Sequence, residues 1–525
     1  MAKLALEEAD VRPRRAGGRV LATLVAAAAV LSASALGRAD EAMEARIAAL
    51  TPELEAYIEK GMAAFDDPGL AIGIVSGDKL VYAKGFGARS KGGEPVGTDT
   101  VFQIGSTTKA FLATTMAIAA DRDKLAWDAR VVDLDVEFAM EDPWVTREFR
   151  VFDLLAQRSG MPPYANDTMG LLGADRATLV HALRYVEPVS SFRSTFAYTN
   201  VTHMLAARIV AKQLGVADWD TVVRTEIFEP LRMTSTSLTA EAIEAMPNHA
   251  EGHRWAPTGT VQVPFTEIFP YDFSAAGAIN SNIDDLSRWM RLHLGNGTFE
   301  GKRIVSAENL AVTKMPRVAI NDKLTYAMGW VVQITPAGRY VWHNGGTMAF
   351  GSYIGAAPEH DVGVIVLTNE TNVGFPDAIG EWTLDRLLDN PKVDHVAARL
   401  EAAKANFAAG QKFAEMPPVR QPPTVLEPLV GTYETPGFGE ASASVDAGSL
   451  VVKLELTGAK LKLDDRGGQA FNVGLVPEGR FAAIAEGNGP GPVGIIQFET
   501  DAKGGIGGFR FMAGDNGQIY TFTRK

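Results

Sequence analysis

The chain has 525 residues, of which 46% are hydrophobic and 22% charged, with a formal net charge of −13 and no cysteine. Its length suggests two or three domains, and its composition is that of a globular protein. The acidic balance argues against a nucleic-acid partner, because phosphate contacts need clustered Lys and Arg side chains. The lack of cysteine excludes disulfides, thiol catalysis and thiolate metal sites.

The first 37 residues have the pattern of a secretory signal. A basic stretch containing Arg14 and Arg15 precedes an apolar run from Val20 to about Leu31, and the small residues after it provide an A-x-A cleavage site. A retained membrane anchor is the alternative, but the run is shorter than the roughly 20 residues that a span needs. We expect an exported protein, periplasmic or secreted, with no membrane span after signal removal.

The next part of the chain predicts an α+β fold. Residues 43–65 have helical apolar spacing, and two β-rich runs joined by a turn at 76–79 predict a hairpin. Helices dominate from 107 to about 291, strands return at 328–369, and a helix follows at 375–390. Strands at both ends with helices between them predict one mixed sheet beside a helical part.

The C-terminal part has a different composition. A helix at 393–411 leads into the proline-rich "EMPPVRQPPTV", so 393–425 is predicted to be a helix and linker. From 426 to 525, short alternating runs between Gly, Asp and Asn turns predict a small antiparallel β-barrel. The run "RFAAIAE" at 480–486 is interpreted as one of its strands.

The first chemical signal is the stretch "FQIGSTTKAF", in which Ser106 and Lys109 open a predicted helix. At this spacing both side chains share one face, so a desolvated lysine could take the serine proton. Gly105 permits a tight turn, and the helix N-terminus offers N–H groups to a developing negative charge. Ser76 and Lys79 repeat the spacing in a hairpin turn, which is poorly suited to a rigid site. The place of Ser106 at a helix start favours a catalytic pair. The spacing alone would also fit two polar residues on the solvent side of an ordinary helix.

The second signal is Tyr-x-Asn, which occurs at Tyr164 to Asn166 in a proline-rich loop and at Tyr198 to Asn200 before a periodic helix. A helix start fixes side chains better than a loop, which favours the second copy. A phenol can relay protons, and an amide can orient a lysine or a substrate carbonyl. The structural alternatives are a buried aromatic for Tyr198 and an N-cap for Asn200.

The third signal is His343, which ends a predicted strand and precedes Asn344, Gly345 and Gly346. Glycines at a strand end let another backbone come close, although a lone histidine is more often structural and the glycines would suit a bulge. No G-x-S-x-G elbow or Walker A loop occurs. The pair of histidines in "HAEGH" lacks the H-E-x-x-H order, so no metal site is expected.

These three signals, in this order, resemble the serine β-lactamase and DD-peptidase-like superfamily. The resemblance is strongest to its branch of class C β-lactamases, D-aminopeptidases, DD-carboxypeptidases and esterases. "LLAQRSGMPPY", "IFEPLRMTSTSL", "AAGAINSNIDDLSRWM" and "YAMGWVV" are similar to family segments, so the resemblance covers roughly residues 50–390. It implies a β-lactamase/transpeptidase-like hydrolase domain at 38–392, and the barrel resembles the lipocalin-like domain of some members.

The resemblance also implies catalytic roles. Ser106 would be the nucleophile that forms an acyl-enzyme, and Lys109 would accept its proton. Tyr198 would act as general base or proton relay, and Asn200 would position the substrate and the lysine. Neither a metal nor an organic cofactor is implied.

His343 and the three residues after it would complete the site. His343 stands where many relatives have the Lys of Lys-Thr-Gly and would act in the polar network with Gly345, beside a substrate-binding Asn344. Backbone N–H groups of Ser106 and Gly346 would form the oxyanion hole. The replacement of that lysine argues against true β-lactamase activity.

The expected function is an exported serine hydrolase that cleaves amide or ester bonds of small or peptide substrates. The alternatives are a β-lactamase or a non-catalytic protein that binds penicillin or a cell-wall peptide. The family pattern also differs at Gln157, where His is frequent, and at Met348 and Ala349, where Pro and Gly are frequent. The substrate, the role of the barrel and the oligomeric state stay open.

Overall fold

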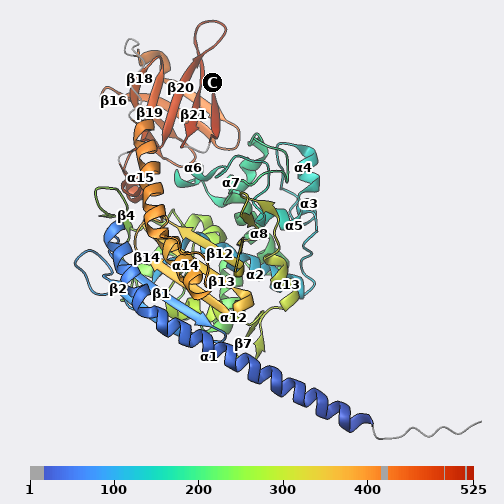
Figure 1. Ribbon diagram of the computed structural model, residues 1–525. Coiled ribbons are helices and arrows are strands. Elements are labelled where there is room, and N and C mark those ends of the chain that lie inside the picture. The colour runs from blue at the N-terminus through green and yellow to red at the C-terminus, as the bar shows by residue number, and fades with distance from the viewer. Residues whose placement is uncertain (1–16, 415–423, 490, 515–516) are drawn as a thin grey trace, which may run out of the picture.

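The computed structural model describes residues 17–414, 424–489, 491–514 and 517–525 (Figure 1). Arg14 and Arg15 of the predicted signal and most of the proline-rich segment lie outside these residues. In the described part of the chain, no helix has both the length and the apolar character needed to cross a bilayer. The first helix, α1 (Gly17–Phe65), projects well beyond the body of the molecule at its N-terminal end (Figure 1).

One eight-stranded sheet has the order β2-β1-β14-β13-β12-β11-β10-β9, and each neighbouring pair is antiparallel. The predicted hairpin, β1 and β2, pairs with the late strand β14, which confirms a sheet built from distant parts of the chain. The strands are β1 (Gly69–Ser76), β2 (Lys79–Gly87), β9 (Val318–Ala319), β10 (Leu324–Tyr326), β11 (Val331–Thr335), β12 (Gly338–Gly346), β13 (Gly351–Ala357) and β14 (Val362–Thr368).

Helices cover both faces of this sheet. One face packs against α1 and α14 (Phe375–Leu387), with α15 (His395–Ala414) next to α14, and the other face packs against α12 (Ile283–Leu294). This double cover buries every residue of β1, β13 and β14, which explains their nearly continuous apolar runs. The predicted α+β fold is therefore confirmed.

The helical part lies beside the sheet, and its buried apolar residues belong to a hydrophobic cluster that also includes residues of the sheet and of the barrel interior. Its central helices are α2 (Thr108–Asp121) and α8 (Val201–Leu214), which pack against each other. Around them lie α3 (Val131–Leu134), α4 (Pro143–Glu148), α5 (Val151–Leu155), α6 (Asp167–Leu171), α7 (Arg176–His181), α9 (Trp219–Val223), α10 (Glu229–Leu231), α11 (Ala240–Glu244) and α13 (Ala307–Thr313). Three short two-stranded sheets are β3 (Phe102–Gln103) with β6 (Asn280–Ser281), β4 (His253–Arg254) with β5 (Val261–Gln262), and β7 (Thr298–Phe299) with β8 (Lys302–Arg303).

The C-terminal part is a closed eight-stranded antiparallel barrel, as the sequence predicts. Its strands follow in chain order, and β22 pairs with β15 to close it. Alternate side chains of the strands are buried inside, as in β17 with its alternating burial. The strands are β15 (Gly431–Thr435), β16 (Gly439–Asp446), β17 (Ser449–Leu454), β18 (Lys460–Gly467), β19 (Ala470–Leu475), β20 (Gly494–Thr500), β21 (Ile506–Ala513) and β22 (Ile519–Arg524).

The prediction of a strand at "RFAAIAE" is wrong. This run forms a short turn, η7 (Gly479–Phe481), and the helix α16 (Ala482–Asn488) between β19 and β20. Phe481 and Ile484, three residues apart, are both buried, which is helical rather than alternating spacing. The alanines between them favour a helix, because alanine has the highest helix propensity.

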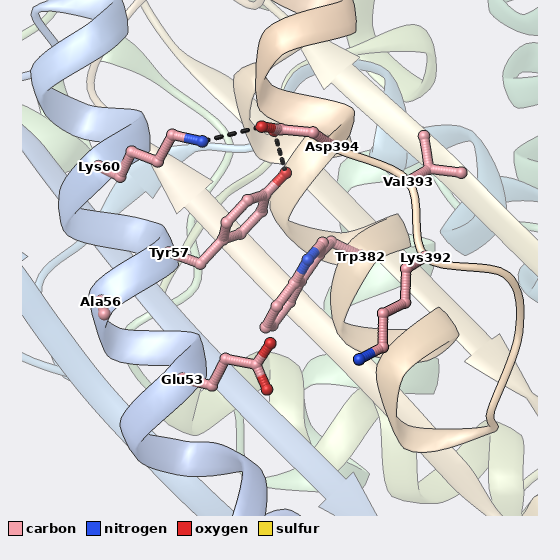
Figure 2. Close-up of a pocket in the computed structure, with 8 residues that line it drawn as sticks. All are labelled: Glu53, Ala56, Tyr57, Lys60, Trp382, Lys392, Val393 and Asp394. Carbon is pink, nitrogen blue, oxygen red and sulfur yellow. Dashed lines mark hydrogen bonds and ion pairs between the residues drawn. The ribbon is translucent and has the colours of Figure 1, made fainter.

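A hollow of about 380 Å³ on the α1 side of the sheet is shown in Figure 2. The ring of Tyr57 stacks on Trp382 with centroids 4.4 Å apart, which holds α1 against α14. Asp394 accepts hydrogen bonds from the Tyr57 hydroxyl (3.1 Å) and from Lys60 Nζ (2.8 Å). None of the predicted catalytic residues lines this hollow, which therefore belongs to the anchoring of α1.

Two buried carboxyls lie beside β1 and β14, and they carry a prediction about stability. Glu370 is 1% exposed and neither of its carboxyl oxygens has a hydrogen-bond partner among the described residues, and Oδ2 of Asp67 has none either. Burial and then the charge of Asp67 raise the pKa of Glu370, and burial raises the pKa of Asp67. A carboxyl whose pKa is higher in the folded than in the unfolded state makes its full contribution to stability below its unfolded-state pKa. This contribution is lost as the pH rises toward its folded-state pKa.

We expect Glu370→Gln to raise the free energy of unfolding by about 1 kcal/mol or more at about pH 8 and to change it little at about pH 5. Glutamine keeps the neutral shape of the side chain and no longer releases a proton on unfolding. Urea unfolding of both proteins at the two pH values measures the difference. Glu187→Gln, at an exposed position, is the matched control, and equal effects of the two variants at high pH would contradict this account.

Candidate active site

The turn that carries Ser106 depends on two glycines. Gly105 begins the turn η1 (Gly105–Thr107) with φ +52°, and a Cβ there would lie 2.7 Å from the backbone nitrogen of Gly346. A Cβ on Gly345 would lie 1.9 Å from the carbonyl oxygen of Ile104. The end of β12 therefore lies directly against the serine turn, and side chains at either glycine would separate them.

Lys109 is fully buried one turn beyond Ser106. Its Nζ donates hydrogen bonds to Ser106 Oγ (3.1 Å), to Asn200 Oδ1 (2.7 Å) and to the carbonyl oxygen of Ala276 (2.7 Å). Burial, opposed by the charge of Asp167, lowers the pKa of Lys109 to about 7. A substantial fraction of the amine is therefore neutral near neutral pH and able to accept the serine proton.

Tyr198 lies beside this pair. Lys109 Nζ is 4.7 Å from the centre of the Tyr198 ring, and the phenol oxygen is buried without a hydrogen bond of good geometry among the described residues. Burial raises the pKa of Tyr198 well above its usual value, and the nearby Ser106 hydroxyl lowers it only slightly. At neutral pH Tyr198 is therefore a phenol, which suits a proton relay better than a free base.

Gln157 fixes the segment between Tyr198 and Asn200. Its Oε1 accepts hydrogen bonds from the backbone N–H (2.6 Å) and the hydroxyl (3.0 Å) of Thr199, and its Nε2 donates to the Thr199 carbonyl (3.1 Å). Gln157, which departs from the family pattern, therefore has a structural role. It fixes Thr199, the residue between Tyr198 and Asn200.

Asn200 occupies the N-cap position of α8, but its side chain makes no capping hydrogen bond. Its Oδ1 accepts from Lys109, and its Nδ2 donates to Asp167 Oδ2 at 2.5 Å. A hydrogen-bond acceptor on one side, Asp167, and a donor on the other, Lys109, allow only one orientation of the amide. The polar chain Asp167, Asn200, Lys109, Ser106 is thus continuous.

Asp167 also belongs to the site, although the sequence did not identify it. It begins α6, and its Oδ1 is buried without a hydrogen-bond partner among the described residues. Burial raises the pKa of Asp167 to about 7, against the hydrogen bond from Asn200 and the charge of Lys109. Its one sequence signal is its place directly after Asn166, in the less favoured copy of Tyr-x-Asn.

His343 lies behind the wall of the cavity. Its Nε2 is 2.9 Å from the Tyr326 hydroxyl, and its Nδ1 is 2.5 Å from the carbonyl oxygen of Asn344. Its ring centre is 6.2 Å from that of Tyr198. Burial, helped by the charge of Lys109, lowers the pKa of His343 to about 3, so the imidazole is neutral at pH 7. Tyr326, its partner, was not identified from the sequence.

A cavity of about 790 Å³ brings these groups together. Of the predicted site residues, it is lined by Ser106, Tyr198, Asn200, Asn344 and Gly346, whereas Lys109, His343 and Gly345 lie behind its wall. The Asn344 side chain is held by a 2.7 Å hydrogen bond to Asp377. Among the residues that the structure describes, no cluster of His, Cys, Asp and Glu could hold a metal ion. The other lining residues are Tyr164, Asp167, Thr168, Leu171, Phe196, Arg254, Phe269, Phe273, Thr347, Met348, Thr371, Asn372, Gly487, Asn488 and Gly514.

The barrel contributes part of this lining. Gly487 and Asn488 of α16 and Gly514 after β21 face the cavity. Gln518 of the barrel makes two hydrogen bonds with Asn166: its Oε1 accepts from the backbone N–H of Asn166 (2.7 Å), and its Nε2 donates to Asn166 Oδ1 (2.8 Å). The barrel therefore docks on the loop that holds the first Tyr-x-Asn copy.

We expect Gly487→Leu to narrow the cavity and to lower kcat/KM for bulky substrates about tenfold more than for small ones. A Cβ on Gly487 would lie 2.8 Å from Cε of Met348, a flexible side chain that would be pushed toward the cavity. The matched control is Gly410→Leu, because Gly410 also lies in a helix and has open space around it. Equal losses for both substrate sizes would show that α16 does not limit access.

Comparison with known proteins places the chain in a family. The family model described as Beta-lactamase matches residues 54–389, more than half of the chain. The chain is 29% identical over 318 residues to Unguisins hydrolase ungD' of Aspergillus campestris, covering 58% of this chain and 59% of that protein. It is 27% identical over 383 residues to Penicillin-binding protein 4 of Amycolatopsis lactamdurans, covering 70% of this chain and 94% of that protein.

A solved structure gives the same fold. The octameric penicillin-binding protein homologue from Pyrococcus abyssi superimposes with a TM-score of 0.57 at 21% identity, over 90% of this chain and 100% of that chain. The match to the first fungal relative spans less than two thirds of its length. The fold, the cavity and the family match agree, and the chain belongs to the Beta-lactamase family of serine hydrolases.

Proposed function

We propose that this chain is an exported serine hydrolase that cleaves amide or ester bonds of small or peptide substrates through an acyl-enzyme on Ser106. The observation that carries the proposal is the 3.1 Å contact between Lys109 Nζ and Ser106 Oγ at the cavity, with the pKa of Lys109 lowered to about 7. Export is inferred from the signal-like pattern of the first 37 residues.

In the first step, Ser106 Oγ attacks the substrate carbonyl carbon while its proton moves to the neutral amine of Lys109. The carbonyl oxygen becomes an oxyanion, which the backbone N–H groups of Ser106 and Gly346 stabilise. A donor of this kind is commonly worth about 3 kcal/mol in the transition state. The leaving group departs with a proton relayed through Tyr198, and the acyl group stays on Ser106.

In the second step, water attacks the acyl-enzyme and gives its proton to the Lys109 and Tyr198 pair. The tetrahedral intermediate collapses, the bond to Ser106 Oγ breaks, and the serine regains its proton. Asn200 keeps Lys109 directed at Ser106 in both steps, because its amide orientation is fixed. The free acid and the first leaving group are the products.

The names of relatives support hydrolysis, since two fungal relatives, from Aspergillus campestris and Aspergillus violaceofuscus, are called hydrolases. His343 is neutral, buried and engaged with Tyr326, so it supplies no cation for a β-lactam carboxylate. We therefore rank ester, D-amino-acid peptide and other peptide substrates ahead of β-lactams.

A mixed panel of aryl esters, D-amino-acid peptides, other peptides and β-lactams tests this function. We expect turnover of at least one class, together with fluorophosphonate labelling of Ser106 identified by mass spectrometry. Complete inactivity on the panel combined with no label on Ser106 would overturn the proposal. Cell fractionation of the producing organism tests export.

The second candidate is a non-catalytic protein that captures penicillin or a cell-wall peptide. The observation that favours it is the docked barrel, which covers part of the cavity and could slow product release. A penicillin adduct on Ser106 that persists for hours without steady-state turnover would select this alternative.

A further inference from the structure

Arg254 is a charged residue of the cavity that no step above uses. It ends the short strand β4 and lines the cavity together with Ser106. Its Nε is buried without a hydrogen-bond partner, and its guanidinium pairs with no carboxylate among the described residues. A buried arginine donor without an acceptor costs free energy, which a bound anion would recover.

The backbone of this strand is firmly held. The N–H of His253 lies 3.1 Å from the carbonyl of Ala349 and 3.0 Å from that of Asn369, so β4 is joined to the segment after β12. On the other side, a Cβ on Gly489 of the barrel would lie 2.9 Å from Cζ of Arg254. The guanidinium is therefore placed between the hydrolase wall and the end of α16.

The other two basic groups near Ser106 cannot serve as an anion site. Lys109 uses Nζ for three hydrogen bonds inside the protein, and His343 is neutral with both ring nitrogens engaged. Neither of them lines the cavity. Among the described lining residues, Arg254 is the one basic side chain.

Arg254 could instead have a purely structural role, in which it binds the last carbonyl groups of α16. A cation at a helix C-terminus is favourable because of the helix dipole. The guanidinium makes no hydrogen bond to α16 among the described residues, and α16 has only seven residues. Its planar, forked donors fit a carboxylate in two parallel hydrogen bonds. A ligand anion therefore explains the residue better than docking does.

We propose that Arg254 binds a carboxylate of the substrate at the barrel end of the cavity, so that the enzyme prefers peptides or esters with a free carboxylate away from the cleaved bond. This inference rests on the proposed hydrolase function. It assigns the anion-binding role to β4, instead of to the strand that carries His343. The barrel takes part in selection, because Gly489 limits where the guanidinium can lie.

Two matched probe pairs test the proposal. The first is an acylated D-alanyl-D-alanine peptide with a free or an amidated C-terminus, and the second is an aryl hemisuccinate ester with its free or methylated carboxyl. We expect wild type to favour the free carboxylate by about tenfold or more in kcat/KM for at least one pair. Arg254→Gln should bring that ratio close to one, and Arg254→Lys should keep part of it.

Two control variants separate charge recognition from barrel docking. Arg480→Gln removes a docking hydrogen bond to the Gly173 carbonyl (3.1 Å), and Arg147→Gln changes an exposed arginine on α4. Both should keep the preference for the free carboxylate. A preference that survives in Arg254→Gln, or none in wild type for either pair, would overturn the proposal.

Binding to Ser106→Ala protein gives a readout that needs no turnover. Calorimetry with the free and the amidated peptide should give a Kd ratio of about ten in this background, which Arg254→Gln removes. If Ser106 takes no label and no probe is hydrolysed, the hydrolase function fails, but this measurement still decides the carboxylate site. Equal Kd values for the two peptides would reject it.

Discussion

We expect Ser106→Ala to lower kcat/KM by about a thousandfold or more on every substrate that the wild-type protein hydrolyses. Alanine removes the oxygen that forms the acyl bond, and among the described residues no second hydroxyl forms a hydrogen bond with Lys109 Nζ. Initial rates over a range of substrate concentrations measure the loss. The fluorophosphonate label should disappear from the protein at the same time.

Ser76→Ala is the matched control, because Ser76 and Lys79 have the same spacing as the proposed pair. Ser76 is buried at the end of β1, whereas Lys79 reaches out to form an ion pair with Glu44 at 2.9 Å. The two side chains therefore do not act together, and activity should be unchanged. Full activity in Ser106→Ala would contradict a serine nucleophile.

The sequence predicted the fold because burial leaves a strong pattern. β1, β13 and β14 are covered on both faces, so each of them is an apolar run in the sequence. The barrel strands are buried on one face only, so their sequences alternate. Where the pattern was short, the prediction failed. "RFAAIAE" alternates weakly over a few residues, and helix propensity together with contacts to the other domain decided its form.

The site was predictable where one local motif carries the chemistry. Ser106 with Lys109, and Tyr198 with Asn200, each follow from a spacing on one element. The contribution of Asp167 depends on tertiary contact, since 33 residues separate it from Asn200. The role of the first Tyr-x-Asn copy could not be predicted from the sequence, because Asn166 forms hydrogen bonds with Gln518 of the barrel, which is distant in the chain.

Tyr326 and Arg254 were missed for a related reason. Tyr326 begins the family-like segment "YAMGWVV", but nothing in that segment indicates that its hydroxyl contacts His343, and Arg254 lies in a short strand without a motif. Each is brought to the site by tertiary contacts. The C-terminal barrel was predicted as a domain of its own, with its role left open. Its α16 forms part of the cavity wall, so substrate selection depends on both parts of the chain.

The pH dependence of kcat/KM should show an acidic limb near pH 7, because Lys109 must lose its proton before it can accept that of Ser106. Burial brings the pKa of Lys109 to about 7, and the charge of Asp167 raises it against that effect. Removing the charge of Asp167 lowers the pKa of Lys109, so more of the amine is neutral at a given pH. We therefore expect Asp167→Asn to move the limb to lower pH by about half a unit to one unit.

Ester hydrolysis measured from about pH 5 to about pH 9 gives the limb for wild type and variant. Asparagine at 167 still offers an oxygen to Asn200 Nδ2, so the loss of charge is separated from the loss of the hydrogen bond. Asp142→Asn, at the exposed N-cap of α4, should leave the limb where it is. A limb that stays in place or moves to higher pH in Asp167→Asn would contradict the coupling of Asp167 to the base, whereas loss of the limb would mean that Asp167 itself is the titrating group. The negative charge of a nearby carboxylate stabilises the protonated form of the amine. Without that charge, Lys109 loses its proton at a lower pH.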